Sequence, residues 1–336
     1  MVRCNETRVP VLDIVVVNWN AGEYLRRCME SVERSSRDGF VLGHVCVVDN
    51  ASSDDSMARI ESFDLPMQVV WNVTNRGFAA ACNQGAGGSQ ADYLLFLNPD
   101  VQLFEDSLSR AVAFMEECGN QDVALSSVQL LDDSGQVARS CARFPTTGRF
   151  FSAMLGLDRV FPKLFPAHFM EEWDHGDTRD VDQVMGAFYL VRRNVFDRLG
   201  GFDERFFVYF EDVDFAYRVA REGLKTRFFA DARVYHKGGV SSEHVKAARL
   251  FYSLRSRILY AYKHLGWHRA TGVALGTFLV EPATRLAWAA LSGSSDDVVE
   301  TLKGYLMLLG DISVLVGAAS QGATQGKEFK PTDGRD

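Results

Sequence analysis

The alternation of short apolar runs with helical patterns in the first hundred residues constrains the fold more than any other feature. Apolar runs of strand length occur at residues 11–17, 44–48, Met67–Trp71 and Tyr93–Leu97. Residues 21–35 repeat apolar side chains at helical spacing, and residues 77–87 form a helix of small residues. Strands that alternate with helices in this way predict an α/β domain with a largely parallel sheet.

Polar residues follow three of these apolar runs. The first run is followed by Asn18, Trp19 and Asn20, the second by Asp49 and Asn50, and the fourth by Asn98, Pro99 and Asp100. Ligands bind beyond the carboxyl ends of the strands in open α/β sheets, so we expect a binding site there. The chain lacks the glycine patterns of dinucleotide dehydrogenases and P-loop NTPases, which disfavours both classes.

Charge and cysteine content narrow the function classes. The formal net charge of -8 makes a nucleic-acid binder a poor candidate, because such binding begins with phosphate neutralisation. We interpret the six cysteines, none in a C-x-x-C pair, as reduced core residues. The N-terminus has no apolar signal-peptide region, and no apolar run has the length of a membrane span. We therefore expect a cytoplasmic protein.

The rest of the chain divides into a long irregular segment, further α/β elements and a helical end. Residues 140–180 look like an excursion at the mouth of a site. We predict strands at residues 184–191, 226–229 and 233–235, and a helix at residues 211–222. Only helical patterns follow residue 241, with Glu281 and Pro282 interrupting one of them.

Five segments resemble a known family. They are VVVNWN (residues 15–20), VVDNASSDDS (47–56), NRGFAAACNQG (75–85), FLNPDV (96–101) and GGFDERFFVYFEDVDFAYRVAREG (200–223). Together they resemble the family 2 glycosyltransferases of the GT-A fold, and their combination is similar to the rhamnosyltransferase-like branch. The resemblance implies a GT-A transferase domain over residues 10–240, built on a Rossmann-like, mainly parallel sheet. A C-terminal helical region (241–320) and a polar tail (321–336) would follow it.

The resemblance implies a nucleotide-sugar donor site at the first strand ends. Asp49 would accept a hydrogen bond from the pyrimidine ring N–H, with Asn18, Asn20 and Asn50 beside it. Trp19 lies where an aromatic ring can stack on the base. Asp49 as a simple loop cap and Trp19 as a core residue are the structural alternatives.

The diphosphate and its metal would lie next to that site. Arg76 and the helix N-terminus at Gly77 suit an anion. The resemblance implies that Asp100 and His236 hold Mg²⁺ or Mn²⁺, with the phosphates and water completing the shell. Asn98 replaces the first carboxylate of the family's D-x-D-like motif, which removes one negative charge. A turn without a ligand at Asn98–Asp100, and a structural role for His236, are the alternatives.

An acidic pair supplies the catalytic candidates. Glu211 and Asp212 emerge from the apolar segment at residues 206–210, and desolvation there tends to raise a carboxyl pKa. The resemblance implies that Asp212 removes the acceptor's proton and that Glu211 orients or assists. An acidic helix N-terminus is the structural alternative. We predict an Asp214–Arg218 ion pair, and place Gly186 on the acceptor face.

The combined hypothesis is an inverting transfer of rhamnose or a similar sugar. The donor would be a dTDP- or UDP-sugar, and the acceptor a saccharide or lipid-linked saccharide of a cell-surface polymer. The face around residues 251–257 would touch the inner side of an anionic membrane, or pack on the catalytic domain. A sugar-phosphate nucleotidyltransferase lacks support, because no basic glycine-rich loop follows the first strand. A degenerate, non-catalytic binding module is the remaining alternative.

Overall fold

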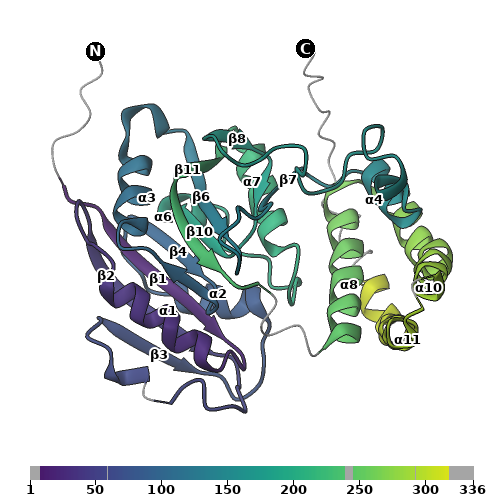
Figure 1. Cartoon of the computed structure of the whole chain (residues 1–336), viewed down its shortest axis with the longest axis horizontal. Helices are drawn as coiled ribbons and strands as arrows, with labels where there is room; N and C mark the ends of the chain where they lie inside the picture. Colours follow the sequence, from purple (N-terminus) through teal and green to yellow (C-terminus); the bar gives the residue numbers. More distant parts are fainter. Residues whose placement is uncertain (1–7, 59, 239–244, 292, 318–336) are drawn as a thin grey trace. The chain divides into compact units, whose positions relative to one another are not determined.

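The computed structural model describes residues 8–58, 60–238, 245–291 and 293–317 (Figure 1). The predicted polar tail, residues 321–336, lies outside these residues, as does Cys4. The chain divides into two compact units. The sheet unit falls within Met1–Phe144 and Ala167–His244, and the helical unit within Pro145–Pro166 and Val245–Asp336.

The sheet unit is built on one large mixed sheet. Its strands are β1 (Val11–Asn18), β2 (Val41–Asp49), β3 (Met67–Trp71), β4 (Tyr93–Leu97), β5 (Val101–Leu103), β6 (Val123–Leu131), β8 (Arg179–Val181), β10 (Phe188–Arg192) and β11 (Lys225–His236). The strand order is β3-β2-β1-β4-β10-β6-β11-β5, with β8 paired to β11. The first four strands run parallel, and β10 is antiparallel to both of its neighbours. The predicted α/β class with a mainly parallel sheet is confirmed.

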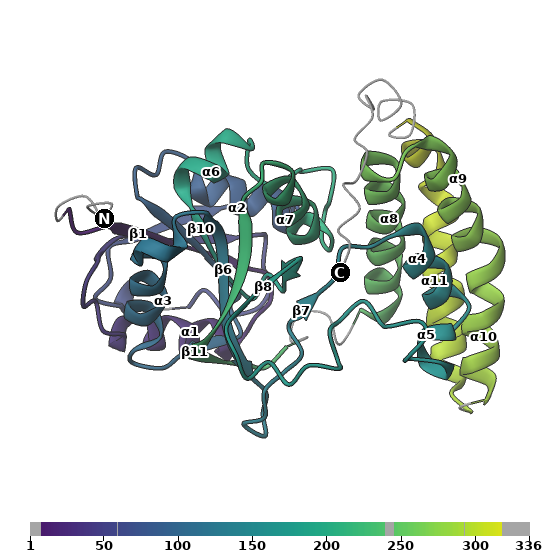
Figure 2. The same cartoon turned by 90° about the horizontal axis from the view of Figure 1, so that it is seen from above.

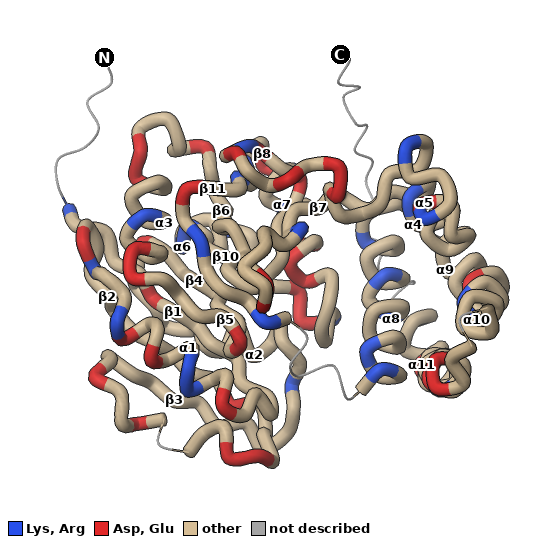
Figure 3. The backbone as a smooth tube through the Cα atoms, in the orientation of Figure 1, with Lys and Arg blue, Asp and Glu red and all other residues tan. Residues whose placement is uncertain are grey.

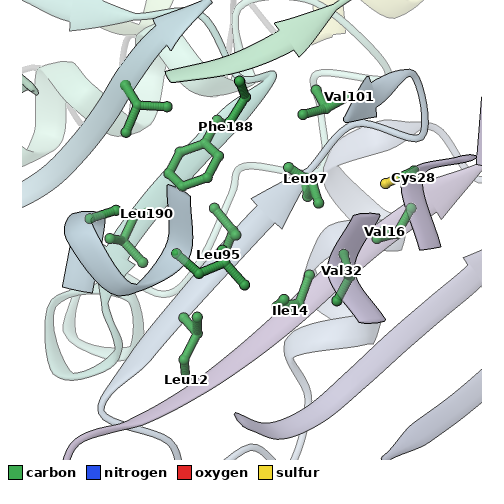
Figure 4. Packing of buried hydrophobic residues seen from close by; sticks show 14 of the residues in the cluster. Leu12, Ile14, Val16, Cys28, Val32, Leu95, Leu97, Val101, Phe188 and Leu190 are labelled. Atoms are coloured by element: carbon green, nitrogen blue, oxygen red, sulfur yellow. The ribbon is translucent and has the colours of Figure 1, made fainter. Parts of the chain in front are cut away.

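Helices cover both faces of this sheet because its central strands are apolar on both sides. On β1, Ile14 and Val16 join the cluster that includes α1 (Glu23–Arg34) and α3 (Ser107–Glu116), as Figure 4 shows for part of it. The alternate residues Val15 and Val17 join a second cluster. Its helices are α2 (Phe78–Ala86), α6 (Arg193–Arg198) and α7 (Glu211–Arg221). Two-sided burial of this kind is typical of parallel sheets.

Two predictions about local structure in this unit were wrong. The two short strands expected at residues 226–229 and 233–235 are one strand, β11, with a register shift between Phe229 and Arg233. The strand expected at residues 184–191 is divided into β9 (Gln183–Val184) and β10. Between β2 and β3 the described residues form no α-helix and contain only the 3₁₀ turn Ile60–Ser62. In this segment Asp54 accepts a hydrogen bond from the backbone N–H of Gly22 at 2.9 Å.

The irregular segment at residues 140–180 contains a buried histidine that fixes its fold. His175 Nε2 accepts a hydrogen bond from the backbone N–H of Cys141 at 3.1 Å, and Nδ1 therefore donates to Trp173 O at 3.0 Å. The two rings stack with centroids 4.2 Å apart. Cys141 begins β7 (Cys141–Ala142), which pairs with β9 just before Gly186. Burial lowers the pKa of His175, so the neutral form holds this segment.

The helical unit takes in part of the irregular segment. Its elements are α4 (Thr147–Met154), α5 (Leu157–Val160), α8 (Lys246–His264), α9 (Trp267–Leu275), a π-helix (Gly276–Val280), α10 (Glu281–Leu291) and α11 (Ser295–Gly310) (Figure 2). The prediction that Glu281 and Pro282 interrupt a helix was wrong, because the chain stays helical from α9 through α10. Proline is tolerated there because it lies in the first turn of α10, directly after the π-helix.

Cysteine pairing and helix length complete the comparison with the sequence predictions. Cys28, Cys46, Cys82 and Cys141 are free and buried, as expected. Cys118 is disulfide-bonded, so the interpretation of every cysteine as reduced was wrong. In the part of the chain that the structure describes, no helix is both long and apolar enough to cross a membrane.

Candidate active site

The ends of β1 and β2 bring Asn18 and Asp49 into direct contact. They are register partners in the parallel pair, and Asn18 Nδ2 donates to Asp49 Oδ1 at 2.9 Å. Asp49 Oδ2 accepts from the backbone N–H of Ser52 at 3.2 Å. Both Asn18 and Asp49 are buried. The Asp49 carboxylate is therefore held in one orientation at the sheet edge before any ligand arrives.

Asn50 organises the loop that carries Arg76 and Gly77. Its Nδ2 donates to Asn75 Oδ1 at 2.9 Å and to Gly77 O at 3.1 Å. Its Oδ1 accepts from the backbone N–H of Arg76 at 3.0 Å and from Asn72 Nδ2 at 3.1 Å. Asn50 thus uses donors and acceptors together to fix the N-R-G turn. All four of these side-chain hydrogen bonds hold the turn in place, so Asn50 shapes the site.

Trp19 and Arg76 present their side chains at the surface of this region. Trp19 is half-buried and Arg76 is exposed. Asn20, next to Trp19, has a positive φ of 52° and accepts from the backbone N–H of Ser53 at 2.7 Å. Among the described residues neither Trp19 nor Arg76 makes a side-chain hydrogen bond to another candidate. The structure therefore brings the amide side chains and Asp49 together, whereas the side chains of Trp19 and Arg76 make no hydrogen bond to them.

Gly77 brings the N-terminus of α2 against the segment that precedes Glu211. It precedes α2 with φ 85° and ψ 168°, a region that is essentially restricted to glycine. A Cβ at this position would lie 2.4 Å from Phe207 O. Phe78 N donates to the same oxygen at 2.6 Å. The absence of a side chain at Gly77 is what lets the segment before Glu211 approach the N-terminus of α2.

Asp100 and His236 form a largely buried pair beyond the end of β4. Asp100 follows β4, and His236 ends β11, which pairs with β5 so that His236 is opposite Val101. The distance from His236 Nε2 to Asp100 Oδ1 is 3.4 Å. The described residues contain no cluster of three or more metal-ligating side chains. A carboxylate and an imidazole suit a divalent ion that takes its other ligands from phosphates and water, so these residues fit the metal that the sequence predicts.

Asn98 precedes Asp100 by two residues and carries an amide in place of a carboxylate. Its backbone N–H donates to Ala187 O at 2.9 Å, and its carbonyl accepts from Cys28 Sγ at 3.7 Å. Asn98 is half-buried. These contacts fix the backbone that leads from β4 to Asp100.

The two acidic residues at the start of α7 have different environments. Asp212 Oδ1 accepts from the backbone N–H of Val213 at 2.8 Å, and Oδ2 accepts from that of Gly186 at 3.2 Å. Glu211 is 6% exposed, and its Oε2 has no hydrogen-bond partner among the described residues. Burial raises the pKa of Glu211 well above its usual value, and the neighbouring Asp212 raises it further. Burial also raises the pKa of Asp212, but the two N–H donors oppose that effect.

These environments shift the pKa values of Glu211 and Asp212 by different amounts. Glu211, which is buried with its Oε2 unpartnered among the described residues, holds a proton more tightly than Asp212 does. Asp212, which accepts hydrogen bonds from the backbone N–H groups of Val213 and Gly186, is the residue of the pair that ionises more readily. Two titratable neighbours with pKa values pushed apart are typical of acid–base sites. The predicted ion pair also forms, with Arg218 Nε 2.8 Å from Asp214 Oδ2.

The backbone before Glu211 is strained. Tyr209 and Phe210 have φ values of 66° and 70°, although neither is glycine. Each such residue costs about 1–2 kcal/mol relative to the ordinary helical region. Strain of this kind concentrates at functional sites, where the surroundings hold the backbone in place. Here it turns the chain so that the acidic pair leaves an apolar segment and starts α7 at once.

The sequence predictions missed several supporting residues. Tyr189 OH donates to the carbonyl of Asp212 at 3.0 Å and so holds the start of α7. Ser52 Oγ lies 2.9 Å from Asn18 Nδ2 and accepts from the backbone N–H of Asn20 at 3.0 Å. Ser52 lies within the motif at residues 47–56, so the motif carried a signal for it. Tyr189 is part of an apolar strand, where nothing in the sequence distinguishes it from a core residue.

Comparison with known proteins identifies the class. Residues 13–199 match the model of the family described as glycosyl transferase family 2. The chain belongs to glycosyltransferase family 2, as the sequence motifs predict.

Two curated relatives and one solved structure extend the comparison. The chain is 27% identical over 279 residues to an N-acetylglucosaminyl-diphospho-decaprenol L-rhamnosyltransferase of Mycobacterium tuberculosis, covering 77% of this chain and 87% of that protein. It is 26% identical to the rhamnosyltransferase WbbL of Escherichia coli, covering 66% and 82%. The mannosyltransferase PcManGT of Pyrobaculum calidifontis, solved in complex with GDP-Man and Mn²⁺, has a TM-score of 0.53 with 18% identity, covering 96% of this chain and 89% of that one. The fold is that of the GT-A glycosyltransferases.

Proposed function

We propose that this protein transfers rhamnose or a similar sugar from a dTDP- or UDP-sugar to a hydroxyl of a lipid-linked saccharide, with inversion at the anomeric carbon. Family membership and the two rhamnosyltransferase relatives support the class and the sugar. One relative's name specifies an N-acetylglucosaminyl-diphospho-decaprenol acceptor, which supports the lipid-linked class. The observation that carries the proposal is the pair of unlike carboxyl groups at the start of α7.

Asp212 acts as the general base. The acceptor oxygen attacks the anomeric carbon, its proton passes to the Asp212 carboxylate, and the bond from that carbon to the diphosphate oxygen breaks. The N–H groups of Val213 and Gly186 fix both carboxylate oxygens in position. Burial raises the pKa of Glu211 and so favours its protonated form, which adds no second negative charge beside the base. Gly186 keeps the space in front of Asp212 open, because a Cβ there would lie 3.5 Å from Oδ2.

Asp49, Asp100 and His236 position the donor. Asp49 receives the base of the nucleotide, and Trp19 stacks on it. Arg76 and the N-terminus of α2 face the diphosphate. Asp100 and His236 would hold Mg²⁺ or Mn²⁺, which when bound would supply positive charge beside the diphosphate. The related mannosyltransferase was solved with Mn²⁺ bound, which supports a divalent ion in this protein as well.

A lipid-linked acceptor would bring the protein to the cytoplasmic side of a membrane, within the synthesis of a cell-envelope polysaccharide. The face that the sequence predicts for membrane contact, around residues 251–257, is not free. Arg255 and Arg257 are paired with Asp311 and Glu281, and Phe251 is buried. These contacts do not support membrane contact through Arg255, Arg257 or Phe251.

A panel of nucleotide sugars tests the proposal. Purified protein with Mg²⁺ or Mn²⁺ should release nucleoside diphosphate from one dTDP- or UDP-sugar, and a chelator or Asp100→Ala should abolish release. Asp38→Ala, at an exposed aspartate, is the matched control and should leave release unchanged. Calorimetric titration with UDP and dTDP separates the alternatives. Binding without turnover in the presence of a lipid-linked acceptor would favour the non-catalytic module, and no binding of either nucleotide would refute the donor site.

A further inference from the structure

Trp71 ends β3 in the same row of the sheet as Asp49. The two residues are register partners in the parallel β2–β3 pair, and Asn18 is the partner of Asp49 on β1. Two residues earlier on these strands, Val47 belongs to the first hydrophobic cluster and Val69 packs against it. Side chains alternate between the two faces of a strand, so Asp49 and Trp71 both project to the face of that cluster.

The Trp71 side chain is 59% exposed. Among the described residues its indole stacks on no other ring, lies beneath no cation and donates no hydrogen bond. Trp173 shows how this chain uses a structural tryptophan, since it is 7% exposed, stacks on His175 and donates to Asp177 Oδ1 at 2.8 Å. The ring face and the N–H of Trp71 are therefore available to a ligand.

The position of Trp71 on an edge strand makes its composition informative. β3 lies at the edge of the sheet, where charged side chains usually protect the strand. Its sequence, MQVVW, contains no Lys, Arg, Asp or Glu, as Figure 3 shows for β3. Asn72 N donates to Asp49 O at 2.9 Å and so holds the end of β3 against β2. An indole thus takes the last position of the strand, and no charged side chain of β3 competes for the neighbouring Asp49 carboxylate.

The spacing of the strands suits a flat base beside Asp49. Asp49 Oδ1 accepts from Asn18 and Oδ2 from Ser52, and each oxygen keeps a second lone pair for a ring N–H. Neighbouring strands lie about 4.8 Å apart, so Trp71 starts one spacing from Asp49, and Trp19 follows β1 on the other side. The two spacings together are about 9.6 Å. That span leaves room for a base that contacts an aromatic ring on each side at about 3.5–4.0 Å.

We propose that Trp71 stacks on the pyrimidine base of the donor nucleotide from the β3 side, while Asp49 accepts the hydrogen bond of the ring N–H. The inference rests on the proposed function, because it takes Asp49 as the acceptor for the base. It adds a binding residue that lies outside the five sequence motifs. Stacking uses the π-face that every base has, so Trp71 supplies affinity and Asp49 selects the base.

Calorimetric titration of the full-length protein with UDP and dTDP, in the presence of Mg²⁺, tests the proposal. Trp71→Ala should weaken binding of whichever nucleotide the parent binds by at least about fivefold, because stacking of a base on an aromatic ring contributes that much or more. Trp71→Phe should keep the affinity within about threefold of the parent, since a smaller aromatic ring still stacks.

Trp267→Ala is the matched control. It removes a tryptophan of similar exposure, 54%, from the helical unit, and should bind both nucleotides like the parent. The midpoint of thermal unfolding should be nearly the same in Trp71→Ala and the parent, because an exposed side chain contributes little to stability. A loss of affinity without a fall in this midpoint then reports the missing ring and not a damaged fold.

Two results would overturn the stacking alone. The first is equal nucleotide affinity of Trp71→Ala and the parent. The second is a loss of affinity that Trp71→Phe shares in full, which would show that the aromatic face is not what binds the base. A parent that binds neither nucleotide is a different outcome, because it refutes the donor site of the proposed function and this inference with it.

Discussion

Replacement of Gly77 by alanine tests the connection between the two halves of the site. The new methyl group would lie 2.4 Å from Phe207 O and 2.7 Å from Phe207 Cδ2, distances that real side chains do not show. The backbone carbonyl cannot rotate away alone, because Phe78 N donates to it at 2.6 Å. Either α2 or the segment before Glu211 must therefore move.

The free-energy cost of Gly77→Ala has a backbone part and a contact part, which a control variant can separate. The backbone conformation of Gly77 costs any other residue about 1–3 kcal/mol. Overpacking against Phe207 adds about 1–3 kcal/mol, and loss of the Phe78 hydrogen bond about 1 kcal/mol. The contact part is then about 3 kcal/mol, which corresponds to a fall of roughly 6–12 °C in the midpoint of a domain of this size.

Gly266→Ala is the matched control. Gly266 also precedes a helix, with φ 78° and ψ 154°, but a Cβ there would have nothing within 4 Å. Gly39→Ala adds a positive-φ control in the sheet unit, again without a neighbour. Scanning calorimetry should show a loss for Gly77→Ala that exceeds both controls by the contact part, together with lower donor turnover. If Gly77→Ala and Gly266→Ala lower their transitions equally, the reasoning from the Phe207 contact is wrong.

Four further predictions concern protons and buried charge. Asp212→Asn should lower kcat by about 10²–10⁴-fold with donor binding unchanged. Glu211→Gln should keep kcat within about tenfold of the parent, because the raised pKa of Glu211 already favours its protonated form. Equal losses of kcat in the two variants would contradict the assignment. The parent's kcat should fall as pH drops through the raised pKa of Asp212, since only the ionised carboxylate accepts a proton, and a flat acid limb would argue against it. Burial lowers the pKa of His175 in the folded state below 6.5, so the free energy of unfolding should fall as pH drops below that value. In urea titrations at several pH values, His175→Phe should show a smaller dependence of the unfolding free energy on pH. Glu281→Ala should destabilise the helical unit by about 3–5 kcal/mol because Arg257 loses its buried partner, and a loss under about 1 kcal/mol in denaturant unfolding would show that water replaces the carboxylate.

The parts of the fold that the sequence predicted are those where local pattern and tertiary burial agree. The apolar runs of β1, β2 and β4 are buried on both faces, so their composition alone identifies them. The assignment of residues 145–166 to the helical unit was not predictable in this way, since α4 packs on α9 more than a hundred residues later. The continuation of the helix through Pro282 depends on the π-helix before it, a feature that periodicity does not report.

The candidate site shows the same division. Asn18, Asp49, Asp100 and Asp212 follow strands or begin a helix within motifs, and their positions were predictable from those boundaries. The different environments of Glu211 and Asp212 were not, because they depend on the N–H of Gly186, which only the folded sheet brings to Asp212. Sequence spacing places residues along the chain, and protonation depends on neighbours in space.

The pairing of β5 with β11 has a consequence for the order of folding. β5 is joined to the large sheet only through β11, which comes more than a hundred residues later in the chain. The strands that carry Asn18 and Asp49 can pair as soon as they leave the ribosome, whereas Asp100 must wait for His236 to be synthesised. Contacts of such long sequence separation form slowly, because closing the intervening loop costs entropy before any contact repays it. A nascent chain therefore carries Asn18, Asp49 and Asp100 before it carries Asp212 and His236, so the residues proposed to bind the nucleotide precede the proposed base and the second proposed metal residue.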